Sequence, residues 1–475
     1  MAFGFFKKKP TGADTIFYNG TIYTMDPDQP VVQAVACTNG RVSAIGDTET
    51  ILELEAEETV MVDLEGDFLI PGLIDPAGHP TLEVFRSCSL YLANTLSLDE
   101  VLQEMKRYIE KKPEADVYFA YGFREELLEG KSTEESAAIL DNKGFSDKPI
   151  LLLAEGGDII WLNTPAIEEV RKMAQEDMLP QITLPYILFS LSPFDSNELE
   201  KESTSLGKRY KKQGFTSVLS CGEPGYMQGV YQQCLVDLYQ EEIHYQRFFG
   251  GYLVQKEIAP PVLMQRLIQR KTTCMELDDL FNYNMVKLVV APVNEEENAP
   301  LNISRENLMD ICMEAGDKGF DVHIDAVGCQ ALIHSWEAIA RMRRAGYRRT
   351  TAVIAHEEDL DEINKGLEEP VDFQEAQILE SRPTASVSAP AGAARNRKTD
   401  HYFPDLTCFG STRDLIEYYT LHAAEAIGFE NQLGAIKAGY YADFALFHQD
   451  PFQLTTEQFS QLEADMTVIN GQPTL

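Results

Sequence analysis

From Pro71 to about residue 428, the chain alternates short apolar runs with amphipathic helical patterns. This alternation is typical of βα units, whose strands lie parallel in one sheet under a layer of helices. The apolar runs predict strands at 118–123, 149–155, 215–221, 285–291, 321–327, 351–357 and 384–390. The amphipathic patterns predict helices at 97–112, 197–214, 304–319 and 329–346. The predicted fold is therefore α/β, a (β/α)8 TIM barrel.

The two chain ends have a different texture, with short β-rich segments separated by turns. Asn19-Gly20 and Asn39-Gly40 predict two-residue hairpins, and Asn470-Gly471 predicts a turn near the C-terminus. A small β-sandwich built from both termini, beside the barrel, accounts for this pattern most simply. The predicted boundaries are 1–70 and 429–475 for the two parts of the sandwich and 71–428 for the barrel.

Composition narrows the class of partner. The chain has 475 residues and a formal net charge of −36, from 76 acidic and 40 basic residues. Such a field repels nucleic acids and anionic membranes, so neither is an expected partner. Eight cysteines occur singly, without a C-x-x-C pair, which favours a reducing compartment. With no signal-peptide pattern and no long apolar run, the expected location is cytoplasmic.

The segment 69–80, LIPGLIDPAGHP, carries the first candidate site residues. Its apolar run is broken by Pro71-Gly72 and delivers Asp75 and His79 to the end of a strand. Barrel enzymes place their chemistry at such strand ends. Ala77 stands where a second imidazole would complete a His-x-His pair for a metal.

Several motifs occur in an order and spacing that carry a family resemblance. They include NGTIYTMD, GRVSAIG, LIPGLIDPAGHP, WLNTPAI, HIDAVG, IAHEEDL, LGAIKAGYYADFALF and VINGQ. The chain resembles the amidohydrolase superfamily, most closely the family-3 members called YtcJ-like. The resemblance implies a barrel with a composite β-sandwich, one or two divalent metals that activate water, and hydrolysis of carbon–nitrogen bonds other than peptide bonds. By analogy it also implies a homodimer.

Position by position, the resemblance implies a damaged metal centre. His79, Lys287 and His356 match expected positions, whereas the other three expected positions hold Ala77, Asp325 and Thr412. Ala77 and Asp325 replace metal-binding histidines, and Thr412 replaces the catalytic aspartate. Asp405 or Asp414 would take that role if the alignment slips by a few residues. A substrate pocket is expected at Asp158, Trp161 and Asn163.

Two arrangements of the centre stay open. In the first, one divalent metal (zinc, iron or manganese) binds His79, Asp325 and His356. Lys287, which the resemblance allows to be carboxylated, assists, and Asp75 or Asp414 moves the proton. In the second, no metal binds, and Lys287 forms an ion pair with Asp325 or Asp75. His323 would share the face of Asp325, either as a displaced ligand or as a core histidine.

Two functions follow from these arrangements. One is a metal-dependent hydrolase with a reduced or weakened site. The other is a catalytically inactive protein that keeps the fold and serves as a small-molecule binder or an assembly partner.

Overall fold

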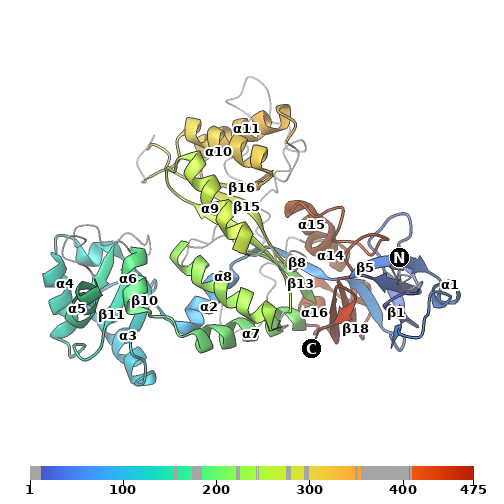
Figure 1. Ribbon diagram of the computed structural model, residues 1–475, viewed down its shortest axis with the longest axis horizontal. Coiled ribbons are helices and arrows are strands. Elements are labelled where there is room, and N and C mark those ends of the chain that lie inside the picture. Colours follow the sequence, from blue (N-terminus) through green and yellow to red (C-terminus); the bar gives the residue numbers. More distant parts are fainter. Residues whose placement is uncertain are drawn as a thin grey trace, which may run out of the picture.

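The computed structural model describes residues 12–154, 159–173, 184–220, 225–241, 243, 245–273, 280–293, 299–347, 351–354, 406 and 409–474. Within these ranges the strands form four sheets. Figure 1 shows strands from both chain ends on one side, a parallel sheet with its helices in the middle, and a separate lobe on the other side.

Strands from both chain ends share one six-stranded sheet, in the order β20-β19-β18-β7-β2-β3. Its members are β2 (Thr21–Tyr23), β3 (Val31–Val32), β7 (Phe68–Pro71), β18 (Phe444–Phe447), β19 (Met466–Ile469) and β20 (Gln472–Pro473). A four-stranded sheet, in the order β5-β4-β1-β6, contains β1 (Thr15–Tyr18), β4 (Ala34–Thr38), β5 (Arg41–Gly46) and β6 (Val60–Asp63). Phe17 and Val35 of the smaller sheet lie in one buried cluster with Leu69 and Phe444 of the larger, so the two sheets share a core.

Two of the three predicted turns join neighbouring antiparallel strands. Asn39-Gly40 (φ 52° and 73°) connects β4 to β5, and Asn470-Gly471 (φ 52° and 74°) connects β19 to β20. Positive φ at both positions is the geometry of a tight hairpin. The hairpin predicted at Asn19-Gly20 is wrong, because β1 pairs with β4 and β6 whereas β2 pairs with β3 and β7. That turn carries the chain from one sheet into the other, and the Asn19 Nδ2 donates to Asp63 Oδ1 at 2.6 Å.

The central sheet is parallel and has the order β17-β16-β15-β14-β13-β8. Its strands are β8 (Leu73–Gly78), β13 (Phe215–Ser220), β14 (Arg247–Val254), β15 (Phe281–Val290), β16 (Asp321–Ala326) and β17 (Thr351–Ile354). Every neighbouring pair runs parallel, as in half of a TIM-type barrel. The strand predicted at 384–390 lies outside the described residues. β14 was not predicted, because Gly250 and Gly251 interrupt its strand pattern.

The strands predicted at 118–123 and 149–155 form, but not in the barrel sheet. They are β10 (Tyr118–Phe123) and β11 (Ile150–Ala154), and they pair in a separate sheet of order β12-β11-β10-β9. Its edges are β9 (Leu90–Tyr91) and the antiparallel β12 (Ile160–Leu162). This lobe lies between β8 and β13 in the sequence and apart from the central sheet in Figure 1. Placing these strands in the barrel is therefore wrong, and β8 pairs directly with β13.

The four predicted helices are confirmed as α3 (Leu98–Lys111), α7 (Ser196–Lys212), α10 (Arg305–Lys318) and α11 (Cys329–Arg344). Three of them begin at a residue whose side chain accepts a bond from the first turn, as an N-cap should: Ser97, Asp195 and Ser304. The longer remaining helices are α2 (Pro80–Cys88), α4 (Thr133–Asp141), α5 (Thr164–Met173), α6 (Leu184–Leu191), α8 (Gly225–Gln240) and α9 (Pro260–Thr273). Shorter ones are α1 (Thr48–Leu52), α14 (Thr412–Glu417), α15 (Ala423–Ala426) and α16 (Thr456–Ser460). In the described part of the chain, none of the helices has the length and apolarity that crossing a bilayer requires.

Candidate functional site

Three predicted polar residues lie on one face of the central sheet. Lys287 of β15 is the register partner of His323 in β16, and Asp325 follows His323 by two residues on the same strand. Alternate residues of these strands, such as Leu288 and Ile324, lie in a buried cluster with α9, α10 and α11. Because side chains alternate along a strand, the polar three face away from those helices. We call this the inner face, and Lys287, His323 and Asp325 the polar cluster.

The cluster contains a buried ion pair. Lys287 Nζ lies 3.9 Å from Asp325 Oδ2, and the two side chains are only 3% and 7% exposed. Within the described residues, neither Lys287 Nζ nor Asp325 Oδ1 has a hydrogen-bond partner. Of the two ion pairs predicted for Lys287, the structure therefore contains the one with Asp325.

His323 is buried and carries no hydrogen bond on either ring nitrogen within the described residues. Burial, then the nearby charges of Lys287 and His79, lower its pKa well below the usual value of 6.5. The imidazole is therefore neutral at pH 7 and can accept a proton or a ligand.

The buried imidazole predicts a pH-dependent stability. Between the lowered pKa of His323 and about pH 6.5, the unfolded chain binds one more proton than the folded chain at this residue. The free energy of unfolding should then fall by up to about 1.4 kcal/mol for each pH unit below 6.5. Urea unfolding at pH 7.5 and 5.5 measures this, and His323→Gln should show a smaller decrease. Equal decreases in both proteins would contradict the prediction.

Asp75, a predicted catalytic acid, lies on the opposite face. It is the register partner of Val218, on the helix-covered side, and it accepts a hydrogen bond of 3.2 Å from the hydroxyl of Tyr210 in α7. A register shift follows it, between the pairs Val218–Asp75 and Ser220–Gly78. This bulge inserts one residue into β8 and changes which face later residues occupy. Asp75 is thus separated from the polar cluster, and no sequence signal pointed to Tyr210.

His79 follows β8 directly and is the N-cap residue of α2, where it is half-buried. Its charge helps to lower the pKa of His323, so the two imidazoles lie within electrostatic reach of each other. The other predicted ligand, His356, lies outside the described residues, as does Asp158. Among the residues that are described, no three His, Cys, Asp or Glu side chains converge as metal ligands would.

Thr412 and Asp414 lie in the first turn of α14. Thr412 is buried, and its hydroxyl donates to the backbone oxygen of Leu454 at 2.6 Å. Asp414 is exposed, and its backbone N–H bonds the Ser411 side chain that caps the helix. No contact found within the described ranges joins either residue to the polar cluster, so the predicted proton-transfer role of Asp414 has no geometric support.

Trp161 and Asn163 belong to the separate lobe and are both buried. Trp161 Nε1 donates to the backbone oxygen of Ser136 at 2.7 Å. The Asn163 side chain donates to the backbone oxygens of Phe145 and Lys148. Its Oδ1 accepts from the backbone N–H groups of Ile150 and Ala166. Every polar group of the two side chains is therefore used by the lobe itself, which gives them a structural role in place of the predicted contact with substrate.

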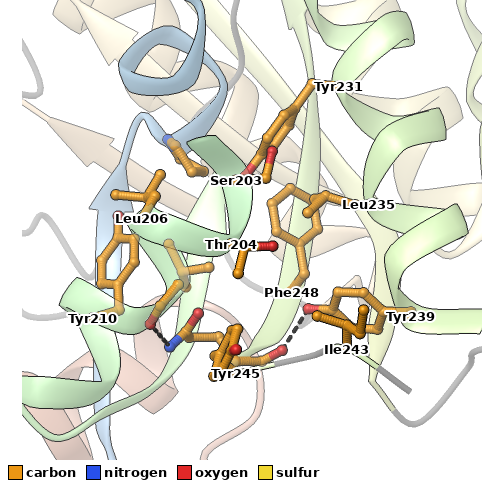
Figure 2. A pocket seen from close by; sticks show the side chains of 14 residues that line it. Ser203, Thr204, Leu206, Tyr210, Tyr231, Leu235, Tyr239, Ile243, Tyr245 and Phe248 are labelled. Atoms are coloured by element: carbon orange, nitrogen blue, oxygen red, sulfur yellow. Dashed lines mark hydrogen bonds between the residues drawn. The ribbon is translucent and has the colours of Figure 1, made fainter. Parts of the chain in front are cut away.

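A cavity lies on the helix-covered side of the sheet and does not include the polar cluster. Figure 2 shows Ser203, Tyr231, Tyr239 and Phe248 around it, with Tyr239 donating to the backbone oxygen of Gln246. Its volume of about 40 Å³ holds a few water molecules at most. The cavity is too small for an organic substrate.

Comparisons with known proteins agree on the family and the fold. The model of the amidohydrolase family matches residues 60–368 and 390–475. The exoenzymes regulatory protein AepA of Pectobacterium carotovorum subsp. carotovorum is 22% identical over 405 residues, which cover 79% of this chain and 86% of that protein. YtcJ of Bacillus subtilis (strain 168), named as an amidohydrolase, is 27% identical over 155 residues, or 32% of this chain and 29% of that protein.

Among solved structures, the fold resembles that of an uncharacterized metal-dependent hydrolase from Pyrococcus horikoshii OT3. The TM-score is 0.56 at 16% sequence identity, and the match covers 93% of this chain and 99% of that one. At this identity the likeness concerns the fold alone.

Proposed function

The chain belongs to the amidohydrolase family, as its motifs predict, and from this premise we propose that it hydrolyses carbon–nitrogen bonds other than peptide bonds. The proposed site is the inner face of the central sheet, with weakened or absent metal binding. Lys287, His323 and Asp325 are the residues that would act there, with His79 beside them.

The observation that carries this proposal is the set of buried polar atoms without partners. Within the described residues, Lys287 Nζ, Asp325 Oδ1 and both ring nitrogens of His323 make no hydrogen bond. Each such atom costs about 1 to 3 kcal/mol, and folded proteins keep few of them. A bound molecule with a carbonyl oxygen and an N–H group would satisfy several of these atoms at once.

The same atoms suit the hydrolysis of an amide-like group. The Lys287 ammonium can donate to the carbonyl oxygen, where negative charge develops as water adds to the carbon. The neutral His323 can accept a hydrogen bond from that water and orient it, and the water's proton passes to the departing nitrogen as the carbon–nitrogen bond breaks. Asp325 holds the ammonium in place through their ion pair.

As they stand, the described residues do not fit a divalent metal. The predicted ligand Asp325 is already paired with the ammonium of Lys287, 3.9 Å away. Its predicted co-ligand His356 lies outside the described residues, so the set of His79, Asp325 and His356 stays a prediction. The roles proposed for Lys287, His323 and Asp325 therefore involve no metal ion.

Lys287→Met is expected to lower kcat/KM about 100-fold or more, because it removes the group that stabilises the carbonyl oxygen. Release of amine or ammonia from N-formyl amines, ureas, cyclic imides and aminated heterocycles would first identify a substrate. Lys271→Met is the matched control, since Lys271 is exposed, donates to Asn284 of β15 and lies 5.6 Å from the ring centre of Phe320, away from the polar cluster. Full activity in Lys287→Met and His323→Gln would place the chemistry elsewhere.

A second function, binding of a small molecule without hydrolysis, is favoured by the ion pair itself. Lys287 and Asp325 neutralise each other, and the family resemblance implies that Thr412 takes the position of the catalytic aspartate. Under this alternative, an amide should raise the thermal unfolding midpoint without forming product.

A further inference from the structure

The positive charge in the polar cluster is the ammonium group of Lys287. Lys287 and Asp325 are both almost fully buried, and the ammonium has no hydrogen-bond acceptor within the described residues. Asp325 is the only acidic side chain with which it forms an ion pair there. Each charge therefore depends on the other for its compensation in the protein interior.

A divalent metal at Asp325 would compete directly with this ammonium. A metal bonded to a carboxylate oxygen lies about 2.1 Å from it. Because Asp325 Oδ2 is 3.9 Å from Lys287 Nζ, a metal on that oxygen would sit within roughly 6 Å of the ammonium. Repulsion at that separation weakens metal binding by roughly 10⁴-fold at an effective dielectric constant of 20.

The remaining donors of the cluster suit a metal once the ammonium is gone. Both ring nitrogens of His323 lack hydrogen bonds within the described residues, and its side chain shares the inner face with Asp325. His79 lies within electrostatic reach of His323. Imidazole and carboxylate together are ligands for zinc and cobalt.

We infer that the Lys287 ammonium is the resident cation of this site, holding Asp325 in place of a divalent metal. Its removal by Lys287→Met then converts Asp325 and His323, with His79 nearby, into a site for Zn²⁺ or Co²⁺. This inference concerns metal binding alone and does not depend on hydrolysis. Metal titration can therefore contradict it while the proposed hydrolysis holds, and an absence of hydrolysis leaves it intact.

The test compares wild type, Lys287→Met, Lys287→Met/Asp325→Asn and the control Lys271→Met. Each is titrated with Co²⁺, and binding is followed by visible absorption, by equilibrium dialysis and by the thermal unfolding midpoint. We expect Lys287→Met to bind one Co²⁺ per chain at least 100-fold more tightly than wild type and to gain thermal stability from it. The double variant should lose that gain, and Lys271→Met should behave as wild type.

Two results would overturn the inference in folded protein. Wild type that binds Co²⁺ as tightly as Lys287→Met shows that the ammonium does not exclude the metal. If Lys287→Met folds but does not bind Co²⁺ tightly, Asp325 and His323 do not form a metal site when the ammonium is removed. If Lys287→Met folds only when Co²⁺ is added, the inference is supported, because the metal then replaces the missing charge. If it stays unfolded with Co²⁺ while Lys287→Met/Asp325→Leu folds, the metal cannot take the ammonium's place.

Discussion

Arg247→Met is expected to lower the free energy of unfolding by about 3 to 5 kcal/mol. Arg247 of β14 donates to both carboxylate oxygens of Asp443, at 2.9 and 3.1 Å, and the two side chains are each 2% exposed. Removing the guanidinium leaves a buried carboxylate without its counter-ion. The loss is measured by denaturant unfolding of the full chain.

The surroundings of this pair explain why the effect should be large. Arg247 Nη2 also donates to Asn470 Oδ1 at 2.6 Å, and Asp443 accepts from the backbone N–H of Asn470 at 3.0 Å. The pair thus ties the central sheet to the β19–β20 hairpin. Tyr441 lies between two guanidiniums, with Arg41 at 4.0 Å and Arg247 at 3.8 Å from its ring centre.

A double variant separates the charge from the rest of the contact. Arg247→Met/Asp443→Leu should recover a large part of the lost stability, because neither buried charge is then left alone. A loss below about 1 kcal/mol in Arg247→Met would mean that Asp443 finds water or another partner.

Helices were predictable because their signals are local. Ser97, Asp195 and Ser304 cap helices whose apolar residues recur at helical spacing, so a short window of sequence contains the whole pattern. The strands predicted at 118–123 and 149–155 form, but they were assigned to the wrong sheet. β10 and β11 are apolar throughout, and such a strand suits any buried sheet, so its pattern does not choose between the barrel and the lobe.

The polar cluster was predictable in part. Strand periodicity places His323 and Asp325 on one face, and the cost of an unpaired buried lysine predicts a carboxylate for Lys287. The separation of Asp75 from the residues that follow it was not predictable, because one residue inserted in β8 after Asp75 reverses the faces of the later side chains, and no sequence pattern marks it. The hairpin predicted at Asn19-Gly20 was wrong because β1 and β2 pair with strands distant in sequence, which a local turn pattern does not reveal.

Trp161→Ala is expected to cost about 3 to 5 kcal/mol of stability and to leave KM unchanged. Trp161 is 1% exposed, packs edge-on against Phe123 with ring centres 5.6 Å apart, and donates to the Ser136 backbone oxygen. Its removal leaves a cavity in the lobe and removes the hydrogen bond to the Ser136 carbonyl, while the polar cluster of the central sheet keeps all its contacts. Denaturant unfolding gives the first quantity, and the identified amide substrate gives the second.

Two further variants distinguish packing from recognition of a substrate. Trp161→Phe keeps most of the packing but loses the N–H, so it should cost less than Trp161→Ala. Asn163→Ala should cost at least as much as one lost buried hydrogen bond, about 1 to 3 kcal/mol, because it removes the partners of four backbone groups. If instead Trp161→Ala raised KM several-fold with little loss of stability, the residue would face a substrate, and the lobe would belong to the binding site after all.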